Sequence, residues 1–358
     1  MSVPWRTAVV GFLLLLLLSA ATLASHGMDP MAFVLERPAD VPAEQTWGIG
    51  YDGQQAYAIA RSPFQPSPAL DHAAYRYMRI VYPATAFVFS FGQPGLLPWT
   101  MLLINLISGG ASAGFLAYLL GKRGAPAWPA LLVTVTFAYW IGVRLDLNEP
   151  LALCLALIGL AAYEDERRKL SLAAFILAGL TKETALVFPL AIAVADIFRQ
   201  RRWRPGMTGL VPLGAYFLWA GFLTFWLGES PFATRQSNLR LLPFAGFAAL
   251  EGLEARTMMV LWVILPAIVL GLLALYELAG RKHSASVESW LVLGNAALLA
   301  SLPDLTWFDP LAVLRMSVGL LMAGVLLLGA YWPRLLPYAA ALWAPSLLVA
   351  FLLPGFIL

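Results

Sequence analysis

Apolar runs separated by short polar segments extend over almost the whole chain. Most runs approach the roughly 20 residues that a helix needs to cross the hydrocarbon core of a bilayer, and repeated long runs indicate helices rather than a barrel. The pattern therefore predicts an all-α, polytopic membrane protein with about eleven transmembrane helices. The spans are expected at residues 5–25, 97–121, 127–144, 149–163, 170–180, 184–198, 208–227, 257–279, 290–303, 310–330 and 335–356.

The first apolar run follows a short N-terminus and carries Arg6. It has two interpretations. It resembles a signal peptide because its apolar core is short and small residues follow, and it resembles an uncleaved span because about 20 residues suffice to cross a bilayer. We favour the uncleaved span, since a polytopic protein needs a first anchor, and we leave open whether residues 1–25 are cleaved.

The composition agrees with a membrane protein and excludes several other classes. Hydrophobic residues make up 60% of the chain and the mean hydropathy is +0.76, more than a soluble domain of this size can keep out of water. The chain is therefore predicted to be one integral membrane domain, residues 1–358. The net charge of +3 reflects arginines in short loops rather than a nucleic-acid-binding surface. The single Cys154 lies in an apolar run and offers neither a disulfide nor a metal cluster.

The basic residues gather in short segments between the apolar runs, and they decide the predicted topology. If the short apolar segment 80–92 does not cross the membrane, residues 122–123 and three later basic clusters all fall on one side. Because basic loops stay in the cytoplasm, the N-terminus is predicted to be cytoplasmic, with external loops at 26–79 and 229–256. Segment 80–92 is then a re-entrant or interfacial helix. The later clusters lie at 164–169, 199–204 and 281–283.

The most polar stretch of the chain, residues 50–83, belongs mainly to the predicted first external loop. It holds Asp52, Asp71 and His72 among tyrosines and arginines, although only 12% of the chain is charged. A loop this long and this rich in aromatic residues is more than a connector, so we interpret it as the catalytic loop of an enzyme at the outer membrane face. Asp71 and His72 have a simpler interpretation as residues that structure the loop.

Three further polar groups interrupt the apolar runs on the same predicted side. Lys182 and Glu183 separate two apolar pieces that are each short for a crossing, and Arg315 lies inside a span. Charged residues at membrane depth are costly, so their convergence on one face indicates a site. Each group also has an ordinary explanation, because loop charges and side chains that snorkel to the interface are common. The third group consists of Asp146, Asn148 and Glu149.

Several of these residues form motifs that resemble a known family. The motifs are Tyr51-Asp52-Gly53-Gln54 with Tyr57, then Asp71, Tyr75-Arg76-Tyr77, Arg79 and Tyr82-Pro83, and later Asp146-x-Asn148-Glu149-Pro150 and Leu180-Thr181-Lys182-Glu183-Thr184. They resemble the first external loop and later motifs of bacterial GT-C superfamily membrane glycosyltransferases, over roughly residues 1–200. Many members carry a paired acidic motif in this loop, whereas here Asp52 is followed by Gly53.

The resemblance implies a GT-C-like fold in the bacterial inner (cytoplasmic) membrane, with the active site facing the periplasm or cell exterior. It implies inverting transfer of a hexosyl or pentosyl group from a polyprenyl-phosphate-linked sugar to a glycan or protein acceptor, among membrane lipids and without nucleic acid. Asp52 matches the general base of the family. The departure at Gly53 leaves open a second acid, for which Asp71 is the candidate, and a divalent cation, Mg²⁺ or Mn²⁺.

The chemistry of such a transfer suggests roles for the other polar residues. A carboxylate must take the proton of the acceptor hydroxyl, and the leaving phosphate needs cations rather than a strong acid. The candidates for binding the donor phosphate are Lys182, Arg315, Arg76 and Arg79. The candidates for orienting the substrates are Glu183, Glu149, Asp146, Asn148, Tyr51, Gln54 and Tyr57.

Two other classes of function remain as alternatives. A transporter or lipid flippase also gathers charges in the membrane, but it favours broken helices at mid-bilayer and internal repeats, which are not visible in this sequence. An inert scaffold or assembly subunit has no need of buried charged groups. Nucleotide hydrolysis and zinc chemistry have no support, because the chain lacks a phosphate-binding Gly-rich loop, a CxxC pair and an HExxH motif.

Overall fold

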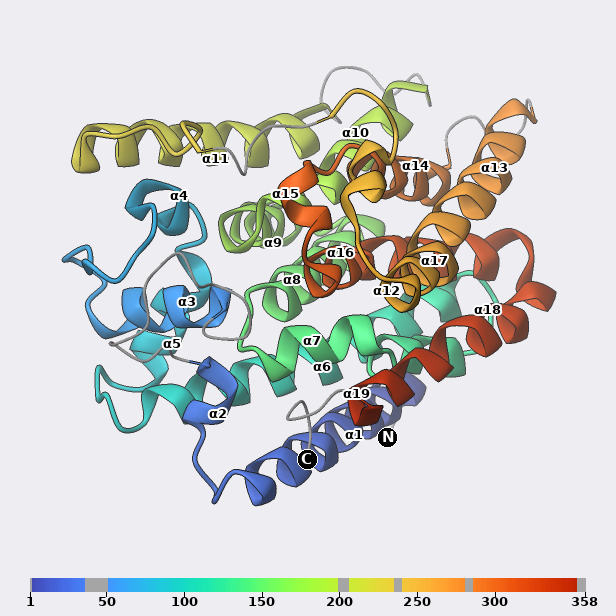
Figure 1. Ribbon diagram of the computed structural model, residues 1–358. Coiled ribbons are helices and arrows are strands. Elements are labelled where there is room, and N and C mark those ends of the chain that lie inside the picture. The colour runs from blue at the N-terminus through green and yellow to red at the C-terminus, as the bar shows by residue number, and fades with distance from the viewer. Residues whose placement is uncertain (1, 36–50, 199–205, 235–239, 281–285, 353–358) are drawn as a thin grey trace.

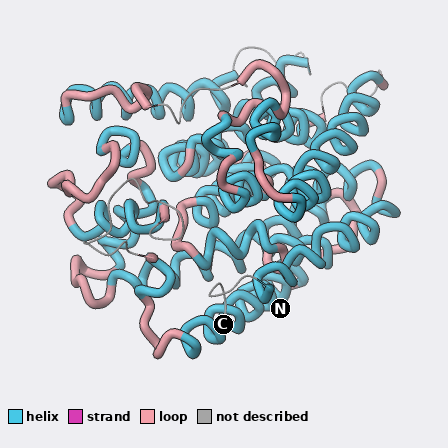
Figure 2. Tube along the Cα trace, in the orientation of Figure 1, coloured by secondary structure: helices cyan, strands magenta, loops and turns pink. Residues whose placement is uncertain are grey.

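The computed structural model describes residues 2–35, 51–198, 206–234, 240–280 and 286–352. These residues form helices joined by turns, and no strand occurs among them (Figures 1 and 2). The prediction of an all-α protein is therefore confirmed for the described part of the chain. Parts of the two predicted external loops (36–50 and 235–239) and the basic clusters at 199–204 and 281–283 lie outside the described residues.

Six helical segments among the described residues are long and apolar enough to cross a bilayer, judged by length and composition. Three are the single helices α1 (Val3–Ser25), α6 (Leu97–Lys122) and α11 (Gly206–Leu227). The other three are composite: α12 (Leu253–Met259) with η5 (Val260–Ile264) and α13 (Leu265–Ala279); α16 (Pro310–Met316) with α17 (Val318–Tyr331); and η6 (Pro333–Leu335) with α18 (Leu336–Trp343), η7 (Ala344–Leu348) and α19 (Val349–Leu352). These long apolar helices support the prediction of a membrane protein.

A seventh candidate span is formed if α7 (Phe137–Arg144) and α8 (Glu149–Glu164) are counted together, although the chain bends by 118° between them. The predicted count of about eleven crossings stays a prediction. Several predicted spans correspond to short helices, such as α9 (Arg168–Thr181), α10 (Val187–Phe198) and α14 (Val287–Ala300). A helix of 14 residues rises only about 20 Å, against roughly 30 Å of hydrocarbon.

The predicted continuous span at 127–144 is divided in the structure. It consists of the 3₁₀ helix η1 (Trp128–Val133) and α7, separated by extended backbone at Thr136. The dividing sequence is Val133-Thr134-Val135-Thr136, and a run of β-branched residues is unfavourable in a helix because it restricts the side-chain rotamers. Hydropathy alone does not register this break, because the residues on both sides of it are apolar.

A face of small residues on α6 allows α1 to pack closely against it. A Cβ atom added at Gly110 would lie 2.8 Å from the carbonyl oxygen of Ala8, closer than a side chain tolerates. Small residues at helix contacts of this kind are typical of membrane proteins, in which dispersion forces and close packing hold helices together. The close approach fixes α1 against α6.

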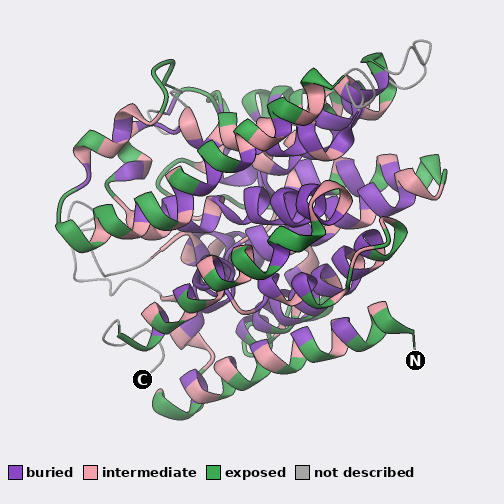
Figure 3. Ribbon diagram, turned by 90° about the vertical axis from the view of Figure 1, so that its right-hand side faces the viewer, coloured by how far each residue is buried: buried purple, intermediate pink, exposed green. Residues whose placement is uncertain are grey.

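The hydrophobic core lies around α17, α8 and α7. Every residue of α17 from Val318 to Gly329 is buried, as expected of a helix that is apolar on all sides and surrounded by other helices. In Figure 3 the buried residues occupy the centre of the bundle, and exposed residues gather on the outer helices. Large apolar side chains on these helices, including Leu17, Leu218 and Leu272, are more than half exposed, which suits contact with lipid.

Short helices gather at the end of the bundle that is on the left in Figure 1. They are α2 (Met31–Val34), α3 (Asp52–Arg61), α4 (Ala73–Tyr77) and α5 (Val81–Phe89). The short apolar segment predicted at 80–92 is thus a nine-residue helix, and its re-entrant or interfacial placement stays a prediction. The remaining short elements are η2 (Glu183–Leu186), η4 (Ala245–Ala249) and α15 (Asp304–Trp307).

The predicted cytoplasmic end is held together by a separate group of ion pairs. Arg123, at the end of α6, contacts Glu164 of α8 at 2.6 Å and Glu288 of α14 at 2.5 Å. Lys122 contacts Asp165 in the following turn. These contacts tie three helices together at residues far from those predicted to carry the chemistry.

Candidate functional site

The candidate site begins with Asp52, in the first turn of α3. Tyr51 before it is extended, and the carboxylate stands at the positive end of the helix dipole. The next residue must be glycine, because a Cβ atom at Gly53 would lie 2.1 Å from the carbonyl oxygen of Leu145. Gly53 therefore lets α3 lie directly against the break between α7 and α8, and so places Asp52 beside the second polar motif.

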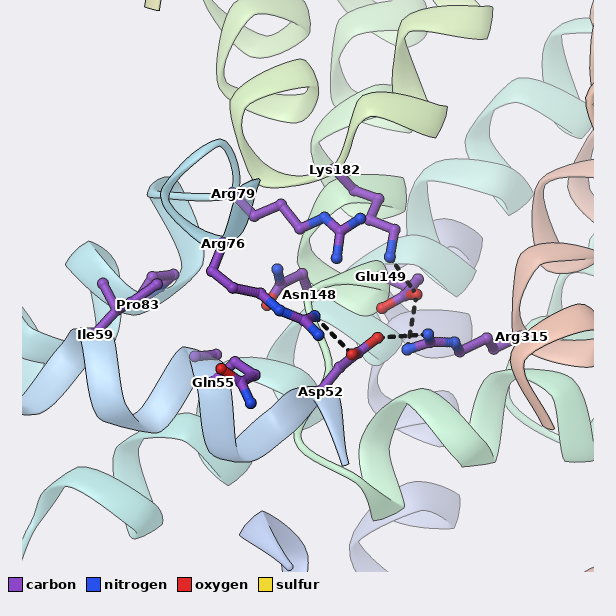
Figure 4. A pocket seen from close by; sticks show the side chains of 11 residues that line it. Asp52, Gln55, Ile59, Arg76, Arg79, Pro83, Asn148, Glu149, Lys182 and Arg315 are labelled. Carbon is purple, nitrogen blue, oxygen red and sulfur yellow. Dashed lines mark hydrogen bonds and ion pairs between the residues drawn. The ribbon is translucent and has the colours of Figure 1, made fainter. Parts of the chain in front are cut away.

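Each carboxylate oxygen of Asp52 accepts a hydrogen bond from a different arginine. Arg76 donates through Nη1 to Oδ1 at 2.7 Å, and Arg315 donates through Nη2 to Oδ2 at 2.5 Å. The Asp52 side chain is 27% exposed, whereas those of the two arginines are 8% and 9% exposed. Figure 4 shows the carboxylate between the two guanidinium groups. Charge-assisted bonds of this kind are among the strongest hydrogen bonds in proteins.

Asp71 holds Arg76 from the other side. The guanidinium donates through Nε to Oδ1 at 2.7 Å and through Nη2 to Oδ2 at 2.5 Å. This two-pronged geometry fixes the orientation of the planar group. Asp71, the candidate second acid, thus contacts an arginine of the site and does not line the central cavity.

Arg315 extends into the site from α16, and two of its three side-chain nitrogen atoms make no hydrogen bond to the described residues. Its Nη1 lies 3.4 Å from Oε1 of Glu149, too long and poorly aligned to count as a hydrogen bond. Nε and Nη1 are buried and have no hydrogen-bond partner among the described residues. The guanidinium stacks 5.0 Å from the ring of Tyr51, whose hydroxyl donates to Asp309 at the start of α16.

Lys182 and Glu149 form a second buried ion pair, with Nζ donating to Oε1 at 2.9 Å. Lys182 follows the last turn of α9 in extended conformation, and η2 begins at the next residue. The break directs the lysine toward the first residue of α8. Ion pairs thus join five side chains in sequence, as the dashed lines in Figure 4 show. The order is Arg76, Asp52, Arg315, Glu149 and Lys182.

Arg79 and Glu183 make a parallel pair. The guanidinium donates to both carboxylate oxygens, at 2.7 Å and 3.1 Å, and also to the hydroxyl oxygen of Tyr75 at 2.6 Å. The Tyr75 ring lies 4.6 Å from this guanidinium and 5.4 Å from that of Arg76. These contacts join the segment that contains α4 to the break between α9 and η2.

The pairs enclose a small cavity that is lined by residues from five different parts of the chain. Its volume is about 10 Å³, room for about one water molecule. The lining residues are Asp52, Gln55, Ala56, Ile59, Arg76, Arg79, Pro83, Asn148, Glu149, Lys182 and Arg315. The ion pairs around it contain four basic and four acidic side chains, so their formal charges balance.

The arginines keep Asp52 and Asp71 ionised. Burial alone would raise the pKa of Asp52, but the positive charges of Arg315 and Arg76 outweigh it and hold the pKa well below its usual range. Burial also raises the pKa of Asp71, but the hydrogen bonds and positive charge of Arg76 outweigh this effect and leave the pKa below its usual value. Both carboxyl groups are therefore charged at neutral pH.

Five of the predicted substrate-orienting residues do not line the cavity: Tyr51, Gln54, Tyr57, Asp146 and Glu183. Tyr57 is buried in a cluster with Val34, Tyr82 and Met101, and Gln54 lies on another face of α3. The ring of Tyr51 packs against the guanidinium group of Arg315. Gln55 lines the cavity instead of Gln54, because residues three and four positions apart share one face of a helix. The spacing from Asp52 to Gln55, Ala56 and Ile59 is a signal that the sequence already contained.

Asp146 also lies away from the cavity. Its side chain is fully buried, its backbone has a positive φ of 48°, and its Oδ1 accepts from Asn105 Nδ2 at 3.3 Å. Asn105 in turn donates to the hydroxyl of Tyr82 at 2.9 Å. Asp146 thus belongs to a polar group under the turn that presents Asn148 and Glu149. Neither Asn105, the one amide side chain in the apolar run 97–121, nor Asp309 was among the residues predicted from the sequence.

The acidic residues of the site do not fit a divalent cation. Mg²⁺ and Mn²⁺ prefer several oxygen ligands around one point, yet both oxygens of Asp52 are occupied by guanidinium groups and Glu149 by Lys182. Within the described ranges no group of three His, Cys, Asp or Glu side chains is arranged to hold a metal ion. We therefore derive no step through a metal.

Comparisons with protein-family models, with curated proteins and with solved structures give no match for this chain. Its function is therefore inferred from its own residues.

Proposed function

We propose that the chain is a membrane glycosyltransferase that moves a sugar from a polyprenyl-phosphate donor to an acceptor hydroxyl with inversion, and that Asp52 is its general base. The observation that carries the proposal is the contact of one carboxylate with two buried arginines, beside a buried lysine. This combination supplies a base and several phosphate-binding groups in one place. The GT-C-like fold, with about eleven crossings and the loop 26–79 outside the cytoplasm, belongs to the same proposal.

The reaction assigned to these groups balances in atoms and charge. The acceptor hydroxyl gives its proton to Asp52 as its oxygen forms a bond to the anomeric carbon. The bond from that carbon to the phosphate oxygen breaks on the opposite face, and the phosphate leaves with the electron pair. The phosphate gains one negative charge as the carboxylate loses one, so the total charge of the site stays constant. Arg76, Arg315 and Lys182 stabilise the leaving group.

The other lining residues suit the sugar rather than the phosphate. Gln55 and Asn148 carry neutral amide groups that both donate and accept hydrogen bonds, as sugar hydroxyls require. Glu149 holds Lys182 and borders the same cavity. Arg79 borders the cavity and is fastened by Glu183, so it is assigned to phosphate binding together with the other basic residues.

The test is a transfer assay with the full-length protein in vesicles, supplied with polyprenyl-phosphate sugars and candidate acceptors. The expected result is a new glycosylated product, reduced by about 100-fold or more in Asp52→Asn. Asp29→Asn is the matched control, because this exposed acid of the same predicted loop accepts a hydrogen bond from the backbone of Met31 and does not line the cavity. Full activity of the purified Asp52→Asn variant overturns the assignment of the base.

The same vesicles separate enzyme from transporter. A transferase attaches the labelled sugar to a second molecule, whereas a transporter or flippase moves an unchanged labelled substrate to the other side of the membrane. Movement across the bilayer without any new product contradicts the proposal.

A further inference from the structure

Each oxygen of the candidate base already accepts a charge-assisted hydrogen bond, which weakens the carboxylate as a base. Both oxygens of Asp52 are engaged by guanidinium groups at 2.7 Å and 2.5 Å. The adjacent cavity of about 10 Å³ is far smaller than the roughly 300 to 1,000 Å³ of ordinary ligand pockets. The ion pairs themselves fill the place that a sugar and its phosphate would occupy. A substrate therefore enters only if some of these pairs separate.

The two arginines differ in how they are held, and both differences favour an exchange of partners. Arg76 keeps two hydrogen bonds to Asp71 through Nε and Nη2, so Nη1 can leave Asp52 while the guanidinium stays in place. Arg315 is 8% exposed, and its Nε and Nη1 have no hydrogen-bond partner among the described residues. An anion can thus bind Nε and Nη1 of Arg315 without competing for Nη2, the atom that donates to Asp52.

Arg315 also borders a second small cavity, on the side of Glu149. It is lined by Thr184, Asn295 and Gly319 in addition to Glu149 and Arg315. Buried donors without partners are costly, because they have lost their water without gaining another acceptor. The atoms present at this position call for an oxyanion or for ordered water.

We propose that the donor phosphate takes the guanidinium groups of Arg315 and Arg76 away from Asp52, so that the base is released only when the donor is bound. The inference rests on the proposed function and adds a control to it. The ligand class is a phosphodiester monoanion, which offers two acceptor oxygens to two guanidinium groups. Without donor, each oxygen of Asp52 keeps its guanidinium partner, so the acceptor hydroxyl and water both meet a weakened base.

The exchange has a measurable consequence for protons. Once its partners face the phosphate, Asp52 is a half-buried carboxylate close to other negative groups, and both conditions favour its protonation. Phosphodiester binding should therefore take up a proton. The charged and titratable groups around Asp52 come from its own helix, from the segment with α4, from α8, from the break after α9 and from α16. They are Tyr51, Asp71, Tyr75, Arg76, Arg79, Glu149, Lys182, Glu183 and Arg315.

The experiment titrates the full-length protein in detergent with dihexyl phosphate, a phosphodiester that does not itself titrate near neutral pH. Isothermal calorimetry in two buffers of different ionisation enthalpy gives the number of protons taken up. The expected result is a measurable fraction of one proton per bound anion at about pH 5.5, falling toward zero at about pH 8. Trihexyl phosphate, which has no charge, is expected to cause no uptake, and titration into empty micelles corrects for partitioning.

The variants decide which group takes the proton. Asp52→Asn is expected to bind the phosphodiester at least as tightly as the wild type, because its arginines are already free, and without proton uptake. Asp29→Asn is expected to keep the uptake. Binding without uptake in the wild-type protein overturns the inference even if Asp52→Asn fails to fold. Uptake that persists in Asp52→Asn overturns it as well, because another acid then takes the proton.

The outcome is separable from that of the proposed function. Proton uptake that depends on Asp52, in a protein with no transfer activity, keeps the exchange and refutes the glycosyltransferase. Transfer activity in a protein that binds phosphodiester without proton uptake keeps the enzyme and refutes the exchange.

Discussion

Replacement of Gly53 by alanine tests whether the close contact of α3 with the α7–α8 break positions the site. The added Cβ would lie 2.1 Å from the carbonyl oxygen of Leu145, whereas ordinary contacts begin at 3.4 Å. The neighbouring atom is backbone and cannot rotate away, so the two segments must separate by about 1.3 Å. A shift of that size, applied to Asp52, lengthens its hydrogen bonds to Arg76 and Arg315 beyond the usual limit of about 3.2 Å.

Two quantities follow from this displacement. Overpacking against rigid backbone should lower the free energy of unfolding by about 1–3 kcal/mol, and a displacement of about 1 Å in the reacting groups should lower the transfer rate by about 100-fold. Thermal unfolding in detergent and the vesicle transfer assay measure these two effects separately. Anion binding by calorimetry reports the state of the arginines in the same preparation.

Gly121→Ala is the matched control. A Cβ at Gly121 meets nothing within 4 Å, and alanine is favoured over glycine in a helix by about 0.5–1 kcal/mol. The control should unfold at the same temperature or slightly higher, with unchanged activity. An unfolding temperature and activity of Gly53→Ala that equal those of Gly121→Ala would refute the idea that this contact sets the position of Asp52.

Three further predictions concern the ion pairs. Lys182→Met leaves Glu149 buried without its main partner and should destabilise the protein by about 3–5 kcal/mol. The additional change Glu149→Leu should restore much of this stability. Thermal unfolding of the single and double variants checks this, and equal losses in both would contradict it. Because the folded-state pKa of Asp71 is lowered, its contribution to stability is present above about pH 4 and is lost as the pH falls through the lowered value. The wild-type unfolding temperature should therefore fall more steeply below about pH 4 than that of Asp71→Asn. The free energy of unfolding involved is about 1 kcal/mol or less, because the Asp71 side chain is 39% exposed. Parallel pH profiles would refute the pairing. Arg79→Lys keeps the charge but cannot hold both oxygens of Glu183, so weaker phosphodiester binding by about tenfold with little change in stability is expected from calorimetry.

The sequence contained enough to predict a membrane protein and to single out the main charged residues of the candidate site. Long apolar runs are sufficient to predict helices such as α1 and α6, because the length of a run and the thickness of the bilayer are directly related. Asp52, Arg76, Lys182 and Arg315 were found because charge is rare in this chain and costly in a membrane. The structure brings all four to one cavity, a convergence that the predicted topology anticipated without distances.

The parts that could not be predicted depend on local backbone geometry. The apolar stretch 127–144 gives no hydropathy signal for the division between η1 and α7. Gln55 rather than Gln54 lines the cavity because α3 begins at Asp52, and a helix boundary is needed before its faces can be counted. Asp146 is separated from Glu149 by the turn between α7 and α8, so these two acids of one motif lie in different surroundings.

The balance of basic and acidic side chains in the candidate site has a consequence for which lipids compete for it. Anionic phospholipids are drawn to membrane-facing basic clusters by about 1 kcal/mol for each Lys or Arg. Here Arg76, Arg79, Lys182 and Arg315 each already face a carboxylate, so the cluster exerts little attraction beyond its own immediate contacts. An abundant phospholipid headgroup therefore gains nothing by approach alone, and discrimination falls to molecules whose shape lets them displace the carboxylates one after another.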